Sequence, residues 1–134
     1  MTLYVDSSAL LKRYVDEPDS EAAEELLRSD VVLATGRHSV VEVRRNLARL
    51  VSDQTLAAAR EGFAADLETL AIVELDPTTC ERAATIAEVT GVRTLDALHL
   101  AAAQRLGGAA IQFLTFDVRQ AQAARSLGFI VLGA

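Results

Sequence analysis

Residues 3–14, LYVDSSALLKRY, predict a short β-strand that runs directly into an α-helix. The first three residues are apolar and include the aromatic and β-branched side chains that strands favour. Asp6 and the two serines after it are residue types preferred at helix N-caps. The helix is expected over residues 9–15 and ends before Pro18, because proline disfavours a helical conformation in the preceding residue.

The same order of strand and helix repeats along the rest of the chain. Asp76, Thr94 and Asp117 are predicted N-caps, and Gly91 is a predicted C-terminal glycine. Strands that alternate with helices predict an α/β domain with a central, mostly parallel sheet of five strands. The further strands are expected at residues 31–34, 71–75, 111–116 and 129–132, and the further helices at residues 20–28, 38–51, 53–69, 77–90, 95–106 and after Asp117.

The length and composition of the chain indicate a single small domain without cross-links. The chain has 134 residues and a formal net charge of −6. A chain of this length buries roughly two thirds of its unfolded surface, so we expect one domain, residues 1–134, without cross-links. One cysteine and two histidines argue against a disulfide framework and against a cluster of zinc ligands. The unpaired Cys80, together with the lack of a signal-peptide pattern and of an apolar run of about 18 residues, predicts a cytoplasmic protein with no membrane contact.

Four carboxylates stand out from their surroundings. Asp6 directly follows the first predicted strand and Asp117 the fourth, and ligands of parallel sheets bind at the carboxyl ends of the strands. Asp96 lies in the otherwise apolar helical segment LDALHLAAA, and Glu42 lies between valines early in its helix. A buried carboxylate is costly unless something compensates its charge. The four residues are therefore candidates for one acidic site.

Each carboxylate also has a simpler interpretation. Asp6 and Asp117 are suitable N-caps, Asp96 suits the positive end of a helix dipole, and Glu42 has the helical spacing to pair with Arg45 or Arg49. Together, however, clustered carboxylates repel one another unless protons or cations are bound. Hard oxygen ligands suit Mg²⁺, with Mn²⁺ as an alternative. Such a site is a candidate for hydrolysis of phosphodiester bonds.

In these motifs the chain resembles the PIN-domain ribonucleases of the VapC toxin type, found in bacterial toxin–antitoxin pairs. The resemblance spans the whole chain. It is carried, in family order, by LYVDSSALLKRY, by EVRRNLARL with Glu42, by TLDALHLAAA with Asp96, and by LTFDVRQAQAARSLG with Asp117.

The resemblance implies a three-layer α/β/α PIN domain and assigns roles to individual residues. Asp6, Glu42, Asp96 and Asp117 match the catalytic and metal-binding acids of the family. Ser8 and Thr115 match its small hydroxyl residues, which would support those acids through hydrogen bonds. The implied activity is that of a Mg²⁺-dependent endoribonuclease acting on structured RNA such as tRNA or rRNA. The implied partners are a second copy of the chain and a VapB-type antitoxin that silences the toxin.

Basic residues near these motifs are candidate contacts to the RNA backbone, because arginine binds phosphate well. His99 is a further candidate, with a buried structural histidine as the alternative, and His38 is read as structural. Residues 16–30 carry seven acids and one base, which accounts for the entire net charge. The acidic balance therefore does not exclude an RNA partner. The basic candidates are Lys12, Arg13, Arg37, Arg44, Arg45 and Arg49, for which salt bridges on a solvated helix face are the alternative.

Two other functions stay open from sequence. The first is a PIN-like module that binds RNA without cutting it and whose acidic cluster is structural. The second is a receiver-like phosphoacceptor domain, which shares the sheet type but would need a lysine near the later strands that this sequence lacks.

Overall fold

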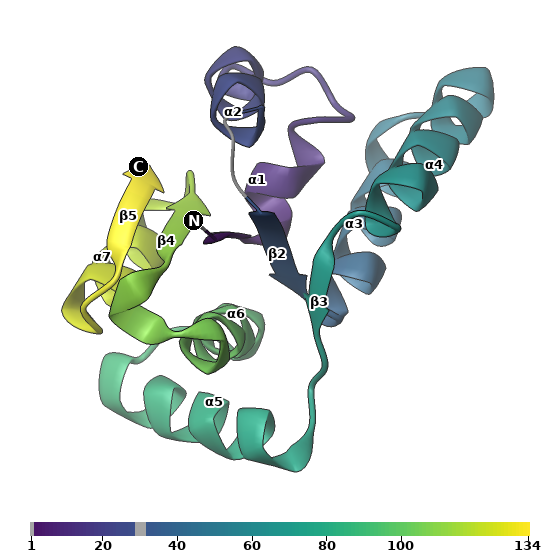
Figure 1. Ribbon diagram of the computed structural model, residues 1–134. Coiled ribbons are helices and arrows are strands. Elements are labelled where there is room, and N and C mark those ends of the chain that lie inside the picture. The colour runs from purple at the N-terminus through teal and green to yellow at the C-terminus, as the bar shows by residue number, and fades with distance from the viewer. Residues whose placement is uncertain (1, 29–31) are drawn as a thin grey trace.

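Five strands form one sheet in the computed structural model, which describes residues 2–28 and 32–134. They are β1 (Thr2–Val5), β2 (Val32–Gly36), β3 (Ala71–Val73), β4 (Gln112–Thr115) and β5 (Ile130–Gly133). Their order is β3-β2-β1-β4-β5, so β1 is central (Figure 1). All neighbouring pairs are parallel, which confirms the predicted α/β class and makes the sheet wholly parallel.

Helices cover both faces of this sheet. They are α1 (Ser7–Leu11), α2 (Ser20–Leu27), α3 (His38–Leu50), α4 (Asp53–Leu67), α5 (Pro77–Thr90), α6 (Thr94–Leu106) and α7 (Val118–Ser126), with a 3₁₀ turn at Gly108–Ala110. Leu3 and Val5 of β1 pack with residues of α1 to α4, whereas Tyr4 packs with residues of α5 to α7. Successive strand side chains point to opposite faces. The result is the expected three-layer α/β/α arrangement.

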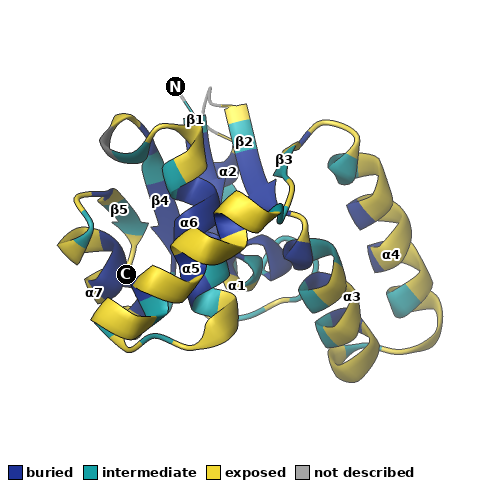
Figure 2. Cartoon of the chain, turned by 90° about the horizontal axis from the view of Figure 1, so that it is seen from below, coloured by how far each residue is buried: buried dark blue, intermediate teal, exposed yellow. Residues whose placement is uncertain are grey.

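Helix α6 is the most enclosed helix of the domain. In both views it lies between α5 and the sheet, and Figure 2 shows it largely buried while the outer face of α5 is exposed. Ala97, Leu100, Ala101, Ala102 and Ala103 are all buried. The prediction that this apolar segment lies in the core is therefore confirmed. Across the described parts of the chain, no helix combines the length and apolar character needed to cross a bilayer.

The first helix is shorter than predicted, ending at Leu11 rather than near residue 15. The next residues form tighter turns, in which the N–H groups of Lys12, Arg13 and Tyr14 donate to carbonyls three residues earlier. Such bonds commonly close the end of an α-helix. They redirect the chain before Pro18.

The predicted caps are mostly confirmed. The side chains of Asp76 and Asp117 accept backbone N–H groups at the starts of α5 and α7, and Gly91 ends α5 in a left-handed conformation. Thr94 is not a cap. It is already helical, and the extended residue before it is Arg93, whose side chain makes no capping bond. Val31, the expected first residue of the second strand, lies outside the described residues, as does Asp30 of the acidic segment.

Gly36, at the carboxyl end of β2, sits where a side chain would not fit. A Cβ atom there would lie 2.5 Å from Cε1 and 2.7 Å from Nδ1 of His38, and 3.0 Å from the hydroxyl of Tyr4. Real Cβ atoms do not approach other atoms this closely, so the His38 imidazole occupies the space left by the missing side chain.

We predict that Gly36→Ala destabilises the protein by about 1–3 kcal/mol, because the extra methyl group forces buried side chains apart. Gly62→Ala is a matched control in α4, where the nearest atom to an added Cβ is Tyr14 Cε1 at 3.9 Å. In an exposed helix this change should stabilise by about 0.5–1 kcal/mol. Urea denaturation measures both changes. Equal effects of the two substitutions would contradict the packing argument.

Candidate active site

Asp6 lies at the carboxyl end of the central strand and is 4% exposed. It is the N-cap of α1, and its Oδ1 accepts hydrogen bonds from the Ala9 amide at 2.9 Å and the Ser8 hydroxyl at 2.8 Å. Burial raises the pKa of Asp6, opposed by the charge of His99 and by hydrogen bonds that include one from Thr115. Ser8 and Thr115, the two hydroxyl residues expected near the acids, thus both interact with the Asp6 carboxylate.

Asp117 occupies the equivalent position after β4, the neighbour of β1. Its Oδ1 accepts from the amides of Arg119 at 2.8 Å and Gln120 at 3.1 Å, and its own amide donates to the Thr115 hydroxyl at 3.1 Å. Thr115 therefore hydrogen-bonds to both strand-end aspartates, Asp6 through its carboxylate and Asp117 through its amide.

Asp96 joins these two residues from the first turn of α6. Burial raises the pKa of Asp96, and the nearby charges of Asp117 and, more weakly, of Asp6 raise it further. The opposing charges are those of Arg93, whose Nε lies 3.7 Å from Asp96 Oδ2, and of His99. The fold therefore brings three of the four predicted acids into electrostatic contact at one edge of the sheet.

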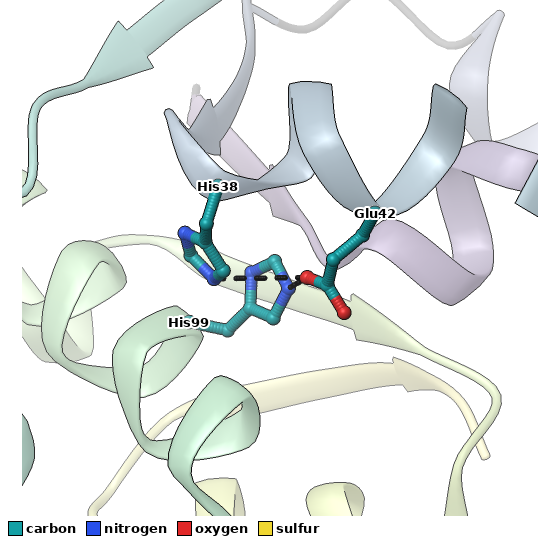
Figure 3. A group of neighbouring side chains, drawn as sticks. All are labelled: His38, Glu42 and His99. Carbon is teal, nitrogen blue, oxygen red and sulfur yellow. Dashed lines mark hydrogen bonds and ion pairs between the residues drawn. The ribbon is translucent and has the colours of Figure 1, made fainter. Parts of the chain in front are cut away.

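Glu42, in α3, is held by a histidine (Figure 3). Its Oε1 lies 2.9 Å from Nε2 of His99 and 3.9 Å from Nε2 of His38. Burial alone would raise the pKa of Glu42, but the hydrogen bond and charge of His99, with smaller contributions from Ser7 and His38, lower it overall. His99 is 2% exposed, so its contacts are to the site and the core.

His38 and Tyr4 are the site neighbours that sequence reasoning did not assign. The Tyr4 hydroxyl lies 2.7 Å from Nδ1 of His99, opposite the Glu42 contact. His38 lies in the core beside His99, with ring centroids 4.0 Å apart. Burial and the charge of His99 together lower the pKa of His38 to about 4, against smaller raising contributions from Glu42 and the Leu95 backbone. The available sequence signal was the spacing of His38 and Glu42, four residues apart on one helix face.

Three of the predicted basic contacts are paired with acids. Lys12 lies 3.7 Å from Glu17 and 3.8 Å from Asp19, and only 10% of its side chain is exposed. Arg13 pairs with Glu24 and Asp66, and Arg37 makes two hydrogen bonds to Glu74 at 2.8 and 2.6 Å. The charges of these three side chains are largely compensated by their partners.

The basic residues farther along α3 are different. Arg44 and Arg45 are exposed and have no acidic partner within residues 2–28 and 32–134, and Arg49 donates to the side chain of Asn46 at 3.0 Å. A cleft of 630 Å³ also opens beside Asp96, with Arg93 and Arg119 on its wall. Neither of these two arginines was singled out from sequence. Cationic side chains therefore flank the acidic site.

Comparison with known proteins assigns the family. Residues 3–126 match the family model of the PIN domain. The chain belongs to the PIN-domain family. It is 35% identical over 133 residues to ribonuclease VapC46 of Mycobacterium tuberculosis (strain ATCC 25618 / H37Rv), which covers 97% of this chain and 95% of the relative. The resemblance to VapC-type PIN domains is thus confirmed.

Solved structures agree in fold. VapC20 of Mycobacterium tuberculosis, described as a Sarcin-Ricin loop cleaving toxin, superposes with a TM-score of 0.75 at 21% identity over 96% of each chain. VapBC2 from Rickettsia felis, bound to a promoter DNA fragment, gives a TM-score of 0.70 at 12% identity over 98% of each chain. At these identities the likeness shows the PIN fold alone.

The acids of this PIN domain are the donor type that a hard divalent cation prefers, although the ligand atoms of Asp6, Asp96 and Asp117 do not all lie within 4.8 Å of one another. The donors are carboxylate oxygens, and the raised pKa values of Asp6 and Asp96 mean that their negative charges are under-compensated. Their nearest guanidinium, that of Arg93, is 80% exposed and so weakly effective. A cation bound between the aspartates would relieve burial and mutual repulsion together.

We predict that Asp96→Asn raises the melting temperature in EDTA at neutral pH, because the amide removes repulsion with Asp117 and Asp6. The pKa of Asp96 is raised in the folded state, so the penalty is absent at low pH and appears as pH rises through that pKa. The gain should therefore vanish near pH 3. Added Mg²⁺ should stabilise the wild type more than the variant. A lower melting temperature for the variant in EDTA would contradict the repulsion.

Proposed function

We propose that this chain is a VapC-type endoribonuclease that uses Mg²⁺, or Mn²⁺ in its place, to cleave structured RNA such as tRNA or rRNA in the cytoplasm. The observation that carries the proposal is the electrostatic interaction of Asp96, in α6, with Asp117 and Asp6, which lie just beyond the carboxyl ends of β4 and β1. The likeness to ribonuclease VapC46 supports RNA as the substrate.

In this mechanism Asp6, Asp96 and Asp117 would hold the cation directly or through water. When bound, Mg²⁺ would offset the negative charge that builds up on the scissile phosphate. Glu42 completes the set of acids and orients the attacking water, and the hydrogen bond from His99 fixes where its carboxylate lies. Ser8 and Thr115 hold the strand-end aspartates in place.

We predict that Asp96→Asn lowers Mg²⁺-dependent RNA cleavage by about 100-fold or more. Loss of a residue that only supports a metal ligand already lowers activity by about 10–100-fold, and loss of a ligand should cost at least as much. Chelation by EDTA should abolish cleavage in the wild type, and Mg²⁺ or Mn²⁺ should restore it. Cleavage ends are mapped by RNA sequencing after induced expression of each variant.

Asp16→Asn is the matched control, because Asp16 is exposed and lies outside the site. Asp6→Ala is a poorer test, since Asp6 caps α1 and its loss also weakens the fold. Full cleavage by Asp96→Asn would refute the assignment. RNA binding without cleavage in the wild type would instead identify the chain as a non-cleaving RNA-binding module.

The arginines of α3 supply the proposed contacts to the RNA backbone. Residues three and seven positions after Glu42 lie on its side of the helix, so Arg45 and Arg49 flank the site while Arg44 points away. The double substitution Arg45→Ala and Arg49→Ala should reduce the slope of log affinity against log salt by about 2.

Arg44→Ala and Arg37→Ala are the controls for this test. The first removes an arginine from the other side of α3, and the second removes one neutralised by Glu74. Filter binding of RNA by the cleavage-deficient Asp96→Asn protein measures the slopes. An equal loss of slope for every arginine removed, whatever its position, would show that RNA responds only to total charge.

The proposed partners are a VapB-type antitoxin and a second copy of the chain. Support for the antitoxin comes from a chain of the same fold in a toxin–antitoxin complex from Klebsiella pneumoniae. Co-expression with the product of a small adjacent gene, followed by light scattering of the purified protein, reports both the complex and the number of copies in it.

A further inference from the structure

His38, Glu42 and His99 form a compact group of potential metal ligands (Figure 3). One ligand atom from each residue lies within 4.8 Å of the other two. The first two residues lie one turn apart on α3, and the third reaches them from α6. This group differs from the three aspartates in donor type, since it offers two imidazole nitrogens and one carboxylate oxygen.

His38 is buried but poorly hydrogen-bonded. It is 7% exposed, and among the described residues neither Nδ1 nor Nε2 makes a hydrogen bond of ordinary geometry, although a weak contact with the Leu95 backbone raises the pKa of the ring. Its closest acidic atom, Oε1 of Glu42, is 3.9 Å from Nε2, too far for a hydrogen bond. A buried polar group without a partner costs free energy. An imidazole kept there, in a space that Gly36 leaves open, therefore needs another explanation.

We propose that His38, Glu42 and His99 form a binding site for a borderline transition-metal ion such as Zn²⁺, beside the aspartates that select Mg²⁺. Two histidines and one glutamate are a ligand set typical of zinc sites that keep one position open to solvent. Magnesium favours all-oxygen ligands and would not compete well here. The small number of cysteines and histidines predicts no cluster of zinc ligands from the sequence alone. The fold nevertheless places both histidines next to a carboxylate.

The distances are close to those that the ion requires. Zn–N and Zn–O bonds of about 2.0–2.1 Å in a tetrahedron separate neighbouring ligand atoms by roughly 3.4 Å. The observed separations from Glu42 Oε1 are 2.9 Å to His99 and 3.9 Å to His38. Shifts of about half an ångström, within reach of side-chain rotation, adapt these two contacts to tetrahedral coordination.

The surroundings also suit a bound metal. The Tyr4 hydroxyl at Nδ1 of His99 fixes the ring so that Nε2 faces the group, as outer partners of metal-bound histidines do. The Glu42 side chain is 19% exposed, which leaves a path for the ion and room for a water ligand. A bound zinc ion would replace the hydrogen bond between His99 and Glu42 that the proposed mechanism uses, and its binding can be measured without RNA.

The test uses the full chain without an affinity tag, with Co²⁺ as a spectroscopic probe in excess Mg²⁺. We expect one Co²⁺ per chain with the intense visible absorption of a four- or five-coordinate site, displaced by Zn²⁺. His38→Leu should lose this absorption and bind Zn²⁺ at least about tenfold more weakly. Its melting temperature without metal should not fall, because the imidazole has no hydrogen bond of ordinary geometry to lose. Glu42→Gln, which keeps the side-chain shape, should weaken binding in the same way.

Two controls separate this site from other ligands. Cys80→Ser removes the chain's only cysteine, an exposed thiol, and Asp117→Asn alters the aspartate cluster. Both variants should retain the cobalt spectrum. Absence of the spectrum in the wild type, its persistence in His38→Leu, or its loss in either control would overturn the proposal.

Discussion

The buried carboxylate of Asp6, at the end of the central strand, links that strand to α1, α6 and β4. Burial disfavours its charge, and four partners from three parts of the chain offset that cost: the Ala9 amide, the hydroxyls of Ser8 and Thr115, and His99. These contacts also start α1 and orient the end of β4. Asp96 and Asp117 add further negative charge nearby, which a bound divalent cation would offset.

The alternation of strands and helices could be predicted because it depends on the residue types of short sequence segments. Short apolar runs followed by Asp or Ser mark each strand end and helix start, as at Asp6 and Asp117. The early end of α1 could not be predicted in this way, since the turns at residues 12–14 carry no Gly or Pro. Nor could Thr94 be rejected as a cap, because its residue type suits that role. Strand order depends on packing between distant segments and is likewise absent from local patterns.

Candidate site residues could be predicted where a charged side chain lies within or directly after an apolar segment. Asp96 is one of two polar residues in the apolar segment LDALHLAAA of α6, and Asp6 and Asp117 follow buried strands. The contact between His38 and His99 could not be predicted, because the two residues are far apart in sequence and only packing brings their rings together. The pairing of Arg37 with Glu74 depends on tertiary structure in the same way, so sequence alone could not separate it from the unpaired arginines of α3.

We propose that the three aspartates at the carboxyl edge of the sheet bind a catalytic divalent cation. This binding is measured most directly by the anomalous scattering of Mn²⁺ in crystals of the wild-type protein grown with that ion. We expect a peak in contact with carboxylate oxygens of Asp6, Asp96 and Asp117. Absence of a peak between these residues at saturating Mn²⁺ would contradict the proposal.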